Sequence, residues 1–222
     1  MLVESGHRVW FAGLLCCIFA MVSEETSSRQ RQWTFRHAAV GKVPKGWQCG
    51  VTGARTGTAP RWKVVDDAGR HVLAQTESGG ANGDFPVCLK TGTSFHNGTV
   101  SIRFKPISGR IDQAGGVVFR AADKDNFYIV RANALENNVS FYVTRGARRK
   151  TIKYWEKIRV DRGAWHELKV TVHDNEFRVW FDGKYVGMAR DPNATWQRPG
   201  MVGLWTKADS VTYFDRLAVE PE

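Results

Sequence analysis

Residues 165–183 read WHELKVTVHDNEFRVWFDG, and this stretch decides the fold. Apolar side chains occupy every second position over 168–172 and, after an Asp-Asn turn, again over 177–181. Such alternation is typical of strands that bury one face. An Asp-Gly pair at 182–183 then predicts a tight turn, because both residues tolerate positive φ angles. The stretch therefore predicts a meander of antiparallel strands that continues into residues 184–186.

Strand patterns of the same kind extend along the chain. Residues 99–106 alternate, whereas residues 115–121 and 127–133 are apolar at both parities, which predicts central strands covered on both faces. Further strands are predicted over 141–144, 150–155, 201–206 and 211–219. So many short strands separated by turns predict an all-β fold, a two-sheet antiparallel jelly-roll sandwich. Residues 33–89, rich in Gly, Pro and Trp, are expected to be less regular and to wrap one end of it.

The composition fits this class. The chain has 222 residues, of which 42% are hydrophobic and 24% charged, and these values exclude bulk disorder. Its 22 Gly, 9 Trp, 12 Phe and 5 Tyr argue against a helical bundle. The length allows one large all-β domain, which we place at 24–222. The formal net charge of +10 suits a negatively charged partner.

The N-terminus predicts export. Arg8 precedes an unbroken apolar run over 9–22, followed by a polar stretch. The run is too short to cross a bilayer of about 30 Å as a helix, and it matches the apolar region of a signal peptide. We expect residues 1–23 to be cleaved, leaving a secreted or periplasmic protein without a membrane span. An uncleaved anchor or a wrongly assigned start codon is the alternative.

Two cysteines remain after this cleavage, Cys49 and Cys88. In an oxidising compartment they are candidates for a disulfide, which would stabilise the fold by about 3–4 kcal/mol in the chain-entropy model. Two buried free thiols are the alternative. A zinc site is disfavoured, since no paired Cys or His spacing accompanies them.

Three stretches together resemble a known superfamily. Residues 165–183, 125–137 (DNFYIVRANALEN) and 203–215 (GLWTKADSVTYFD) are similar to the concanavalin A-like lectins and glucanases. They resemble in particular the secreted bacterial proteins of the 3-keto-disaccharide hydrolase domain family, often described as family-16-like glycoside hydrolases. The resemblance covers residues 95–220 well and 33–94 weakly. It implies a concanavalin A-like fold but no single activity, because this architecture carries lectins, hydrolases, lyases and adhesion modules.

Catalysis would need acidic residues in a defined arrangement. Retaining glycoside hydrolysis uses two carboxyl groups about 5–5.5 Å apart, and the family-sixteen signature E-x-D-x-x-E that supplies them is absent. Glu136, just after a predicted strand, is the candidate general acid or base. A solvated loop carboxylate is the alternative, so whether the chain is an enzyme stays open.

A sugar-binding face combines flat aromatic rings with amide and cationic groups. If Leu204 points into the core, Trp205 is presented outward on a concave sheet. The alternative makes Trp205 a packing residue between the sheets and Arg131 a structural ion-pair partner. The predicted sugar-contacting residues are Arg120, Tyr128, Arg131, Asn133, Trp205 and Lys207.

The positive charge is concentrated over residues 145–162, where eight Lys and Arg side chains stand against Glu156 and Asp161. This run could bind a uronate- or sulfate-bearing polysaccharide through charge-assisted hydrogen bonds. Nucleic acid is not expected as the partner of an exported protein. The alternative is a solvated edge hairpin whose cations prevent association between sheets.

The resemblance also implies a structural calcium ion with Asp215 as a ligand, although calcium takes six to eight oxygens and the sequence names only this carboxylate. Our first functional hypothesis is a monomeric secreted module that binds carbohydrate. The second is a glycoside hydrolase-like enzyme that uses Glu136. The third is an envelope module that recognises protein.

Overall fold

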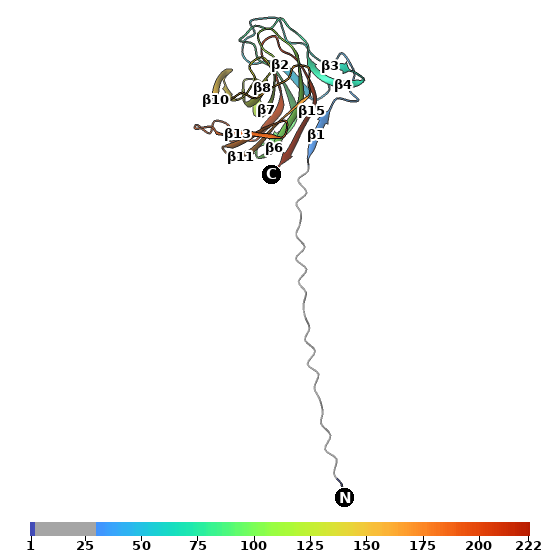
Figure 1. Cartoon of the computed structure of the whole chain (residues 1–222), viewed down its shortest axis with the longest axis vertical. Helices are drawn as coiled ribbons and strands as arrows, with labels where there is room; N and C mark the ends of the chain where they lie inside the picture. Colours follow the sequence, from blue (N-terminus) through green and yellow to red (C-terminus); the bar gives the residue numbers. More distant parts are fainter. Residues whose placement is uncertain (3–29) are drawn as a thin grey trace.

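The computed structural model describes residues 1–2 and 30–222, and within them two antiparallel β-sheets stack as a sandwich (Figure 1). Residues 3–23 of the predicted signal peptide lie outside the described residues. Across the described part of the chain, no helix is long and apolar enough to cross a membrane.

The first sheet has eight strands. They are β1 (Arg31–Thr34), β3 (Trp62–Asp67), β4 (Arg70–Gln75), β6 (Gly98–Ser108), β11 (His166–His173), β12 (Glu176–Phe181), β13 (Lys184–Arg190) and β15 (Val211–Pro221). The spatial order is β13-β12-β11-β6-β15-β4-β3, and β1 pairs with β15. Strands β11, β12 and β13 are consecutive neighbours, which confirms the predicted meander.

The second sheet has seven strands. They are β2 (Trp47–Val51), β5 (Pro86–Phe95), β7 (Ala114–Asp123), β8 (Asn126–Asn133), β9 (Asn138–Arg145), β10 (Arg148–Glu156) and β14 (Gly200–Trp205). The order is β10-β9-β8-β7-β14-β5-β2. The strands predicted to be apolar on both faces, β7 and β8, are therefore central, as expected.

Residues 33–89 are more regular than the sequence predicted. They supply β2, β3 and β4 with parts of β1 and β5, and they form one edge of each sheet rather than a wrap around one end. Of the two alternatives for the cysteines, the structure has the disulfide. Cys49 in β2 lies directly opposite Cys88 in β5, so the bond joins an edge strand to its neighbour.

Aromatic rings fill the space between the sheets. The ring of Phe177 in β12 lies 5.9 Å from that of Phe119 and 4.7 Å from that of Phe141, measured between centroids. Tilted contacts of this kind add to the stabilisation from burial. At Gly115 the sheets approach so closely that a Cβ would lie 2.3 Å from Cδ2 of Phe104. A glycine is therefore required at this position.

A second buried cluster lies on the other face of the seven-stranded sheet. Its members come from β5, β7, β8, β9 and β14 and include Val118, Ile129, Tyr142 and Trp205. Strand alternation separates them from the residues between the sheets. We call this face, turned away from the eight-stranded sheet, the outer face.

Candidate functional site

Polar residues continue the outer face beyond the apolar cluster. In β8, Val130 and Ala132 pack between the sheets, so Arg131 and Asn133 point the other way. Asn133 lies directly opposite Asn138 of β9. Two neighbouring strands thus place amide and guanidinium groups together at one end of the sheet.

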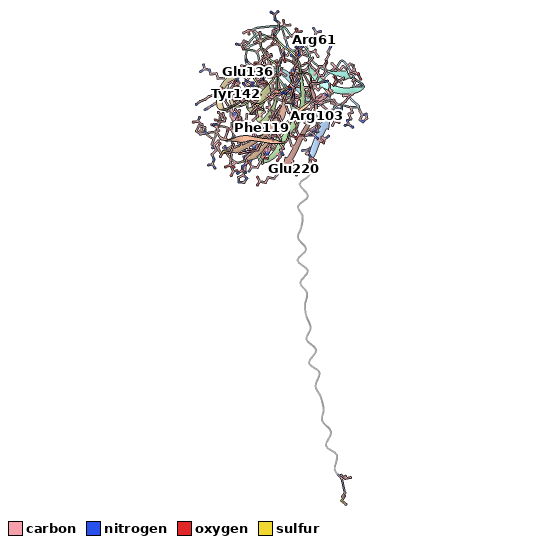
Figure 2. The ribbon with its side chains drawn as sticks, viewed as in Figure 1. Arg61, Arg103, Phe119, Glu136, Tyr142 and Glu220 are labelled. Carbon is pink, nitrogen blue, oxygen red and sulfur yellow. A yellow bond between two sulfur atoms is a disulfide. The ribbon has the colours of Figure 1, made fainter. Side chains whose placement is uncertain are left out.

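Arg131 is the centre of this polar group and is only 2% exposed. Its Nη1 donates to Oδ1 of Asn138 at 2.7 Å, and its Nη2 donates to Oε2 of Glu136 at 2.7 Å and to the hydroxyl of Tyr142 at 3.2 Å. Charge-assisted hydrogen bonds from a buried guanidinium fix the geometry of their acceptors. Glu136 and Tyr142 lie near each other in Figure 2, whereas Arg103 belongs to the other sheet.

The carboxylate of Glu136 is held by one oxygen only. Oε2 accepts from Arg131, from Nδ2 of Asn138 at 2.9 Å and from the hydroxyl of Tyr154 at 3.1 Å. Oε1 has no hydrogen-bond partner among the described residues, and the side chain is 38% exposed. The site therefore presents an oriented oxygen to solvent. We call Arg131, Glu136, Asn138, Tyr142 and Tyr154 the Glu136 network.

The surroundings of Glu136 favour its charged form. Burial opposes ionisation, but hydrogen bonds from Asn138 and Arg131 and the charge of Arg131 outweigh it and lower the pKa of Glu136 to about 2. Of the two predicted roles, general acid or base, these surroundings favour the base, because the ionised carboxylate is the stabilised form. Burial and the charge of Glu136 raise the pKa of Tyr154, so this phenol stays neutral.

We expect Glu136→Gln to destabilise the protein near neutral pH and to have less effect in acid. The pKa of the folded state is depressed, so the ionised form adds stability that is present above the unfolded-state pKa and is lost as the pH falls through about 2. Solvent screening of this part-exposed group reduces the expected contribution to about 1–2 kcal/mol. Urea unfolding of both proteins from neutral pH down to acid measures it, and a difference that does not change with pH would contradict the assignment.

A buried ion pair lies on the same face. Nζ of Lys207 contacts Oδ2 of Asp112 at 2.6 Å, and Nδ2 of Asn133 donates to Oδ1 of Asp112 at 2.8 Å. Asp112 is fully buried. Burial raises the pKa of Asp112 and Lys207 opposes this rise, while the charge of Glu136 adds to it. The predicted residues Arg131, Asn133, Glu136 and Lys207 are therefore brought together.

Trp205 shares the outer face, but the prediction that it is uncovered is wrong. Its side chain is 0% exposed. The ring of Phe85 stacks on the indole at 5.8 Å, and the guanidinium of Arg149 lies 5.6 Å from it and 4.4 Å from the ring of Tyr142. Trp205 is not sealed between the sheets. Instead, a loop residue and a side chain of β10 cover it from outside.

Two further predicted contact residues lie elsewhere. Arg120 has a φ of 49° at an irregularity in β7, which turns its guanidinium to the carbonyl oxygens of His96 and Trp196. Tyr128 has the opposite parity to Arg131, so its ring packs in the core and its hydroxyl donates to Asp191 at 2.7 Å. The structure therefore places Arg120 and Tyr128 apart from the other predicted contact residues, where both join parts of the sandwich internally.

Asp215 does not fit a calcium site. It lies on the eight-stranded sheet, where Oδ1 pairs with Arg70 and Oδ2 with Arg103, each at 2.9 Å. Two guanidinium groups neutralise the carboxylate and would repel a cation. Within residues 1–2 and 30–222, no group of three or more His, Cys, Asp or Glu side chains could hold a metal ion. The calcium prediction at Asp215 is therefore not supported by its surroundings.

The sequence reasoning missed several members of the site. Strand β9 reads NVSFYVTR, and its polar residues alternate with Val139, Phe141 and Val143. This parity could have identified Asn138 and Tyr142 as outward partners of β8. Asp112, Tyr154 and Arg149 carry no such signal, since their roles depend on which strands become neighbours.

The family comparison matches most of the described chain. A model of the 3-keto-alpha-glucoside-1,2-lyase-like domain matches residues 37–220. The chain belongs to this family. Among curated protein sequences, none matches it. Family membership confirms the predicted superfamily. The matched range includes all the residues of the Glu136 network.

Solved structures of similar fold agree with the two-sheet architecture of this lyase-like domain. Carbohydrate-binding module CBM66 from Bacillus subtilis has a TM-score of 0.58 at 20% identity, covering 78% of this chain and 95% of that one. The Bacillus licheniformis beta-glucanase has a TM-score of 0.59 at 12% identity, covering 87% and 98%. A Bacteroides ovatus GH16 protein in complex with a G4G4G3G product has a TM-score of 0.60 at 10% identity, covering 85% and 99%. At these identities the likeness shows the fold.

Proposed function

We propose that this chain is an exported β-sandwich that binds carbohydrate at the end of the outer face around Glu136. The observation that carries the proposal is the orientation of the carboxylate, with Oε2 held by three partners and Oε1 open to solvent. An ionised, fixed oxygen is a strong acceptor for sugar hydroxyls. Tyr154, which is 41% exposed, adds an aromatic ring beside it on which a pyranose could stack.

Three further observations support this proposal. The fold relatives include a carbohydrate-binding module and a GH16 protein solved with a glycan product. The predicted signal peptide and the Cys49–Cys88 disulfide fit an oxidising compartment. The open carboxylate and the tyrosine lie on one sheet face, which suits an extended sugar chain better than a buried small molecule.

A glycan array followed by calorimetry on the strongest ligand tests the proposal. We expect Glu136→Gln to lower the affinity by about tenfold or more, because a charged acceptor is replaced by a neutral one. Glu176→Gln is the matched control, since Glu176 is also an ion-paired carboxylate but lies on the eight-stranded sheet. The proposal fails if no glycan binds, or if both variants bind like the parent protein.

A second candidate function is the elimination that the family's name describes. In a 3-keto-glucoside the ketone makes the C2 proton acidic. A base removes this proton, the C1–O bond breaks, and the departing oxygen takes a proton, leaving a C1–C2 double bond. Glu136 and Tyr154 suit this chemistry because an ionised carboxylate and a neutral phenol lie 3.1 Å apart.

Product analysis separates the two functions. An enzyme would release an unsaturated keto sugar from a 3-keto-glucoside, and Glu136→Gln would abolish release while some binding remains. Binding of glycans without any product would support the module alone. A low pKa makes Glu136 a weak base, which is why we place binding first.

A further inference from the structure

The open edge of the sandwich contains a groove. Strands β10 and β13 end the two sheets on the same side of the molecule and contact each other (Figure 1). Between them lies a cavity of about 690 Å³. The indole of Trp155 forms part of its wall and packs on Gly187, where a Cβ would lie 2.4 Å from Nε1 of Trp155. We call this cavity the edge groove.

Positive charge predominates in the lining of the edge groove. Its lining includes the cations Lys153, Lys157, Lys184 and Arg159. Arg159 is paired with Asp161, but the three lysines form no ion pair within the part of the chain that the structure describes. The lining also contains two carboxylates, Glu156 and Asp182, so its cations outnumber its anions by four to two.

Exposed aromatic rings accompany these charges. Tyr185 is 57% exposed and Tyr154 is 41% exposed, and both line the groove. Exposed aromatic rings that line one groove offer a ligand a flat apolar surface on which to stack. Rings beside cations suit a ligand that has both an apolar face and negative charge.

We propose that the edge groove binds an acidic polysaccharide, with the three lysines contacting carboxylate or sulfate groups and Tyr185 stacking on a sugar ring. Tyr154 lines the groove and also donates to Glu136, so it connects the groove to the proposed carbohydrate site. This connection favours a polysaccharide over nucleic acid. One sugar chain could therefore contact both places. The proposal goes beyond the carbohydrate site at Glu136, since the lysines take no part in the Glu136 network.

The test measures binding to polygalacturonate, dextran sulfate, neutral dextran and single-stranded DNA at about 0.15 M salt, where long-range attraction is screened. The groove variant carries Lys153→Gln, Lys157→Gln and Lys184→Gln. The matched control carries Lys42→Gln, Lys45→Gln and Arg61→Gln, which removes the same charge from exposed positions outside the groove. Both sets lie on the surface, so both variants are expected to fold, and thermal unfolding checks this.

We expect at least one acidic polysaccharide to bind and neutral dextran not to bind at the groove. The groove variant is expected to lose about tenfold in affinity for the acidic polysaccharide, whereas the affinity of the control variant changes little. Tyr185→Ala, which keeps every charge, is expected to lose about threefold or more. Which polymer binds distinguishes carboxylate from sulfate recognition. Equal losses in both triple variants, equally tight DNA binding, or no binding of either acidic polymer would overturn the proposal.

Failure here and failure of the Glu136 proposal are distinguishable. The groove variant leaves Glu136, Arg131 and Asn138 intact, so its binding of a neutral oligosaccharide at the outer face is expected to be unchanged. Glu136→Gln, in turn, leaves the three lysines in place and is expected to retain binding of the acidic polymer.

Discussion

Trp205→Ala is expected to lower the free energy of unfolding by about 3–5 kcal/mol, as for other large-to-small changes in a core. The indole is 0% exposed although it lies outside the space between the sheets. Its removal leaves a cavity beneath Phe85 and takes away one of the rings that surround the guanidinium of Arg149. The outer face would thus lose its packed centre rather than a sugar contact.

Trp165→Ala is the matched control. Trp165 is half-buried on the eight-stranded side, where the cations of Arg103 and Lys105 each lie 5.0 Å from its ring. We expect its loss to cost about 1 kcal/mol, because exposed cation–π contacts are weak. Denaturant unfolding measures both variants. If Trp205→Ala kept its stability but lost glycan binding, Phe85 and Arg149 would have to move aside in solution and expose the indole.

The alternation of apolar and polar residues in the sequence predicted most of the fold. In residues 168–181, apolar and polar side chains alternate because one face packs on the other sheet, and the structure buries Leu168, Val170 and Val179 accordingly. Periodicity is a local property, so it can be read without knowing which strands become neighbours. The short strands within residues 33–89 were not predicted, because a strand of four to six residues shows too few repeats of the alternating pattern.

The residues of the candidate site were predictable only where alternation along a strand determines the sheet face on which a side chain lies. Arg131 and Asn133 share a face of β8 in the sequence and in the structure. Arg120 breaks this rule, because a positive φ in β7 reverses the direction that alternation implies. The cover over Trp205 was not predictable, since Phe85 and Arg149 come from distant segments that only the folded chain brings together.

The largest effect at the site itself is expected from Lys207→Met. This change leaves the fully buried carboxylate of Asp112 without the ammonium group that lies 2.6 Å away. Breaking a buried ion pair from one side costs about 3–5 kcal/mol, because an uncompensated charge remains inside the protein. We therefore expect the variant to lose about that much stability near neutral pH, as measured by urea unfolding.

The loss should depend on pH with a defined sign. Burial already raises the pKa of Asp112, and without Lys207 it is expected to rise further. A carboxyl whose pKa is raised in the folded state destabilises the fold as the pH rises above the unfolded-state value, so acid should reduce the deficit of the variant relative to the parent protein. A deficit that is the same at every pH would instead indicate lost packing of the lysine stem.

A double variant separates charge from packing. Asp112→Asn combined with Lys207→Met removes both charges but keeps an acceptor for the amide of Asn133, which donates to Oδ1 at 2.8 Å in the parent protein. We expect this pair of changes to recover most of the stability that Lys207→Met loses, since replacing both partners is far less costly than removing one. If the recovered protein also keeps its affinity for carbohydrate, Lys207 serves to neutralise Asp112. If it folds but binds weakly, the ammonium group contacts the sugar as well, as the sequence predicted.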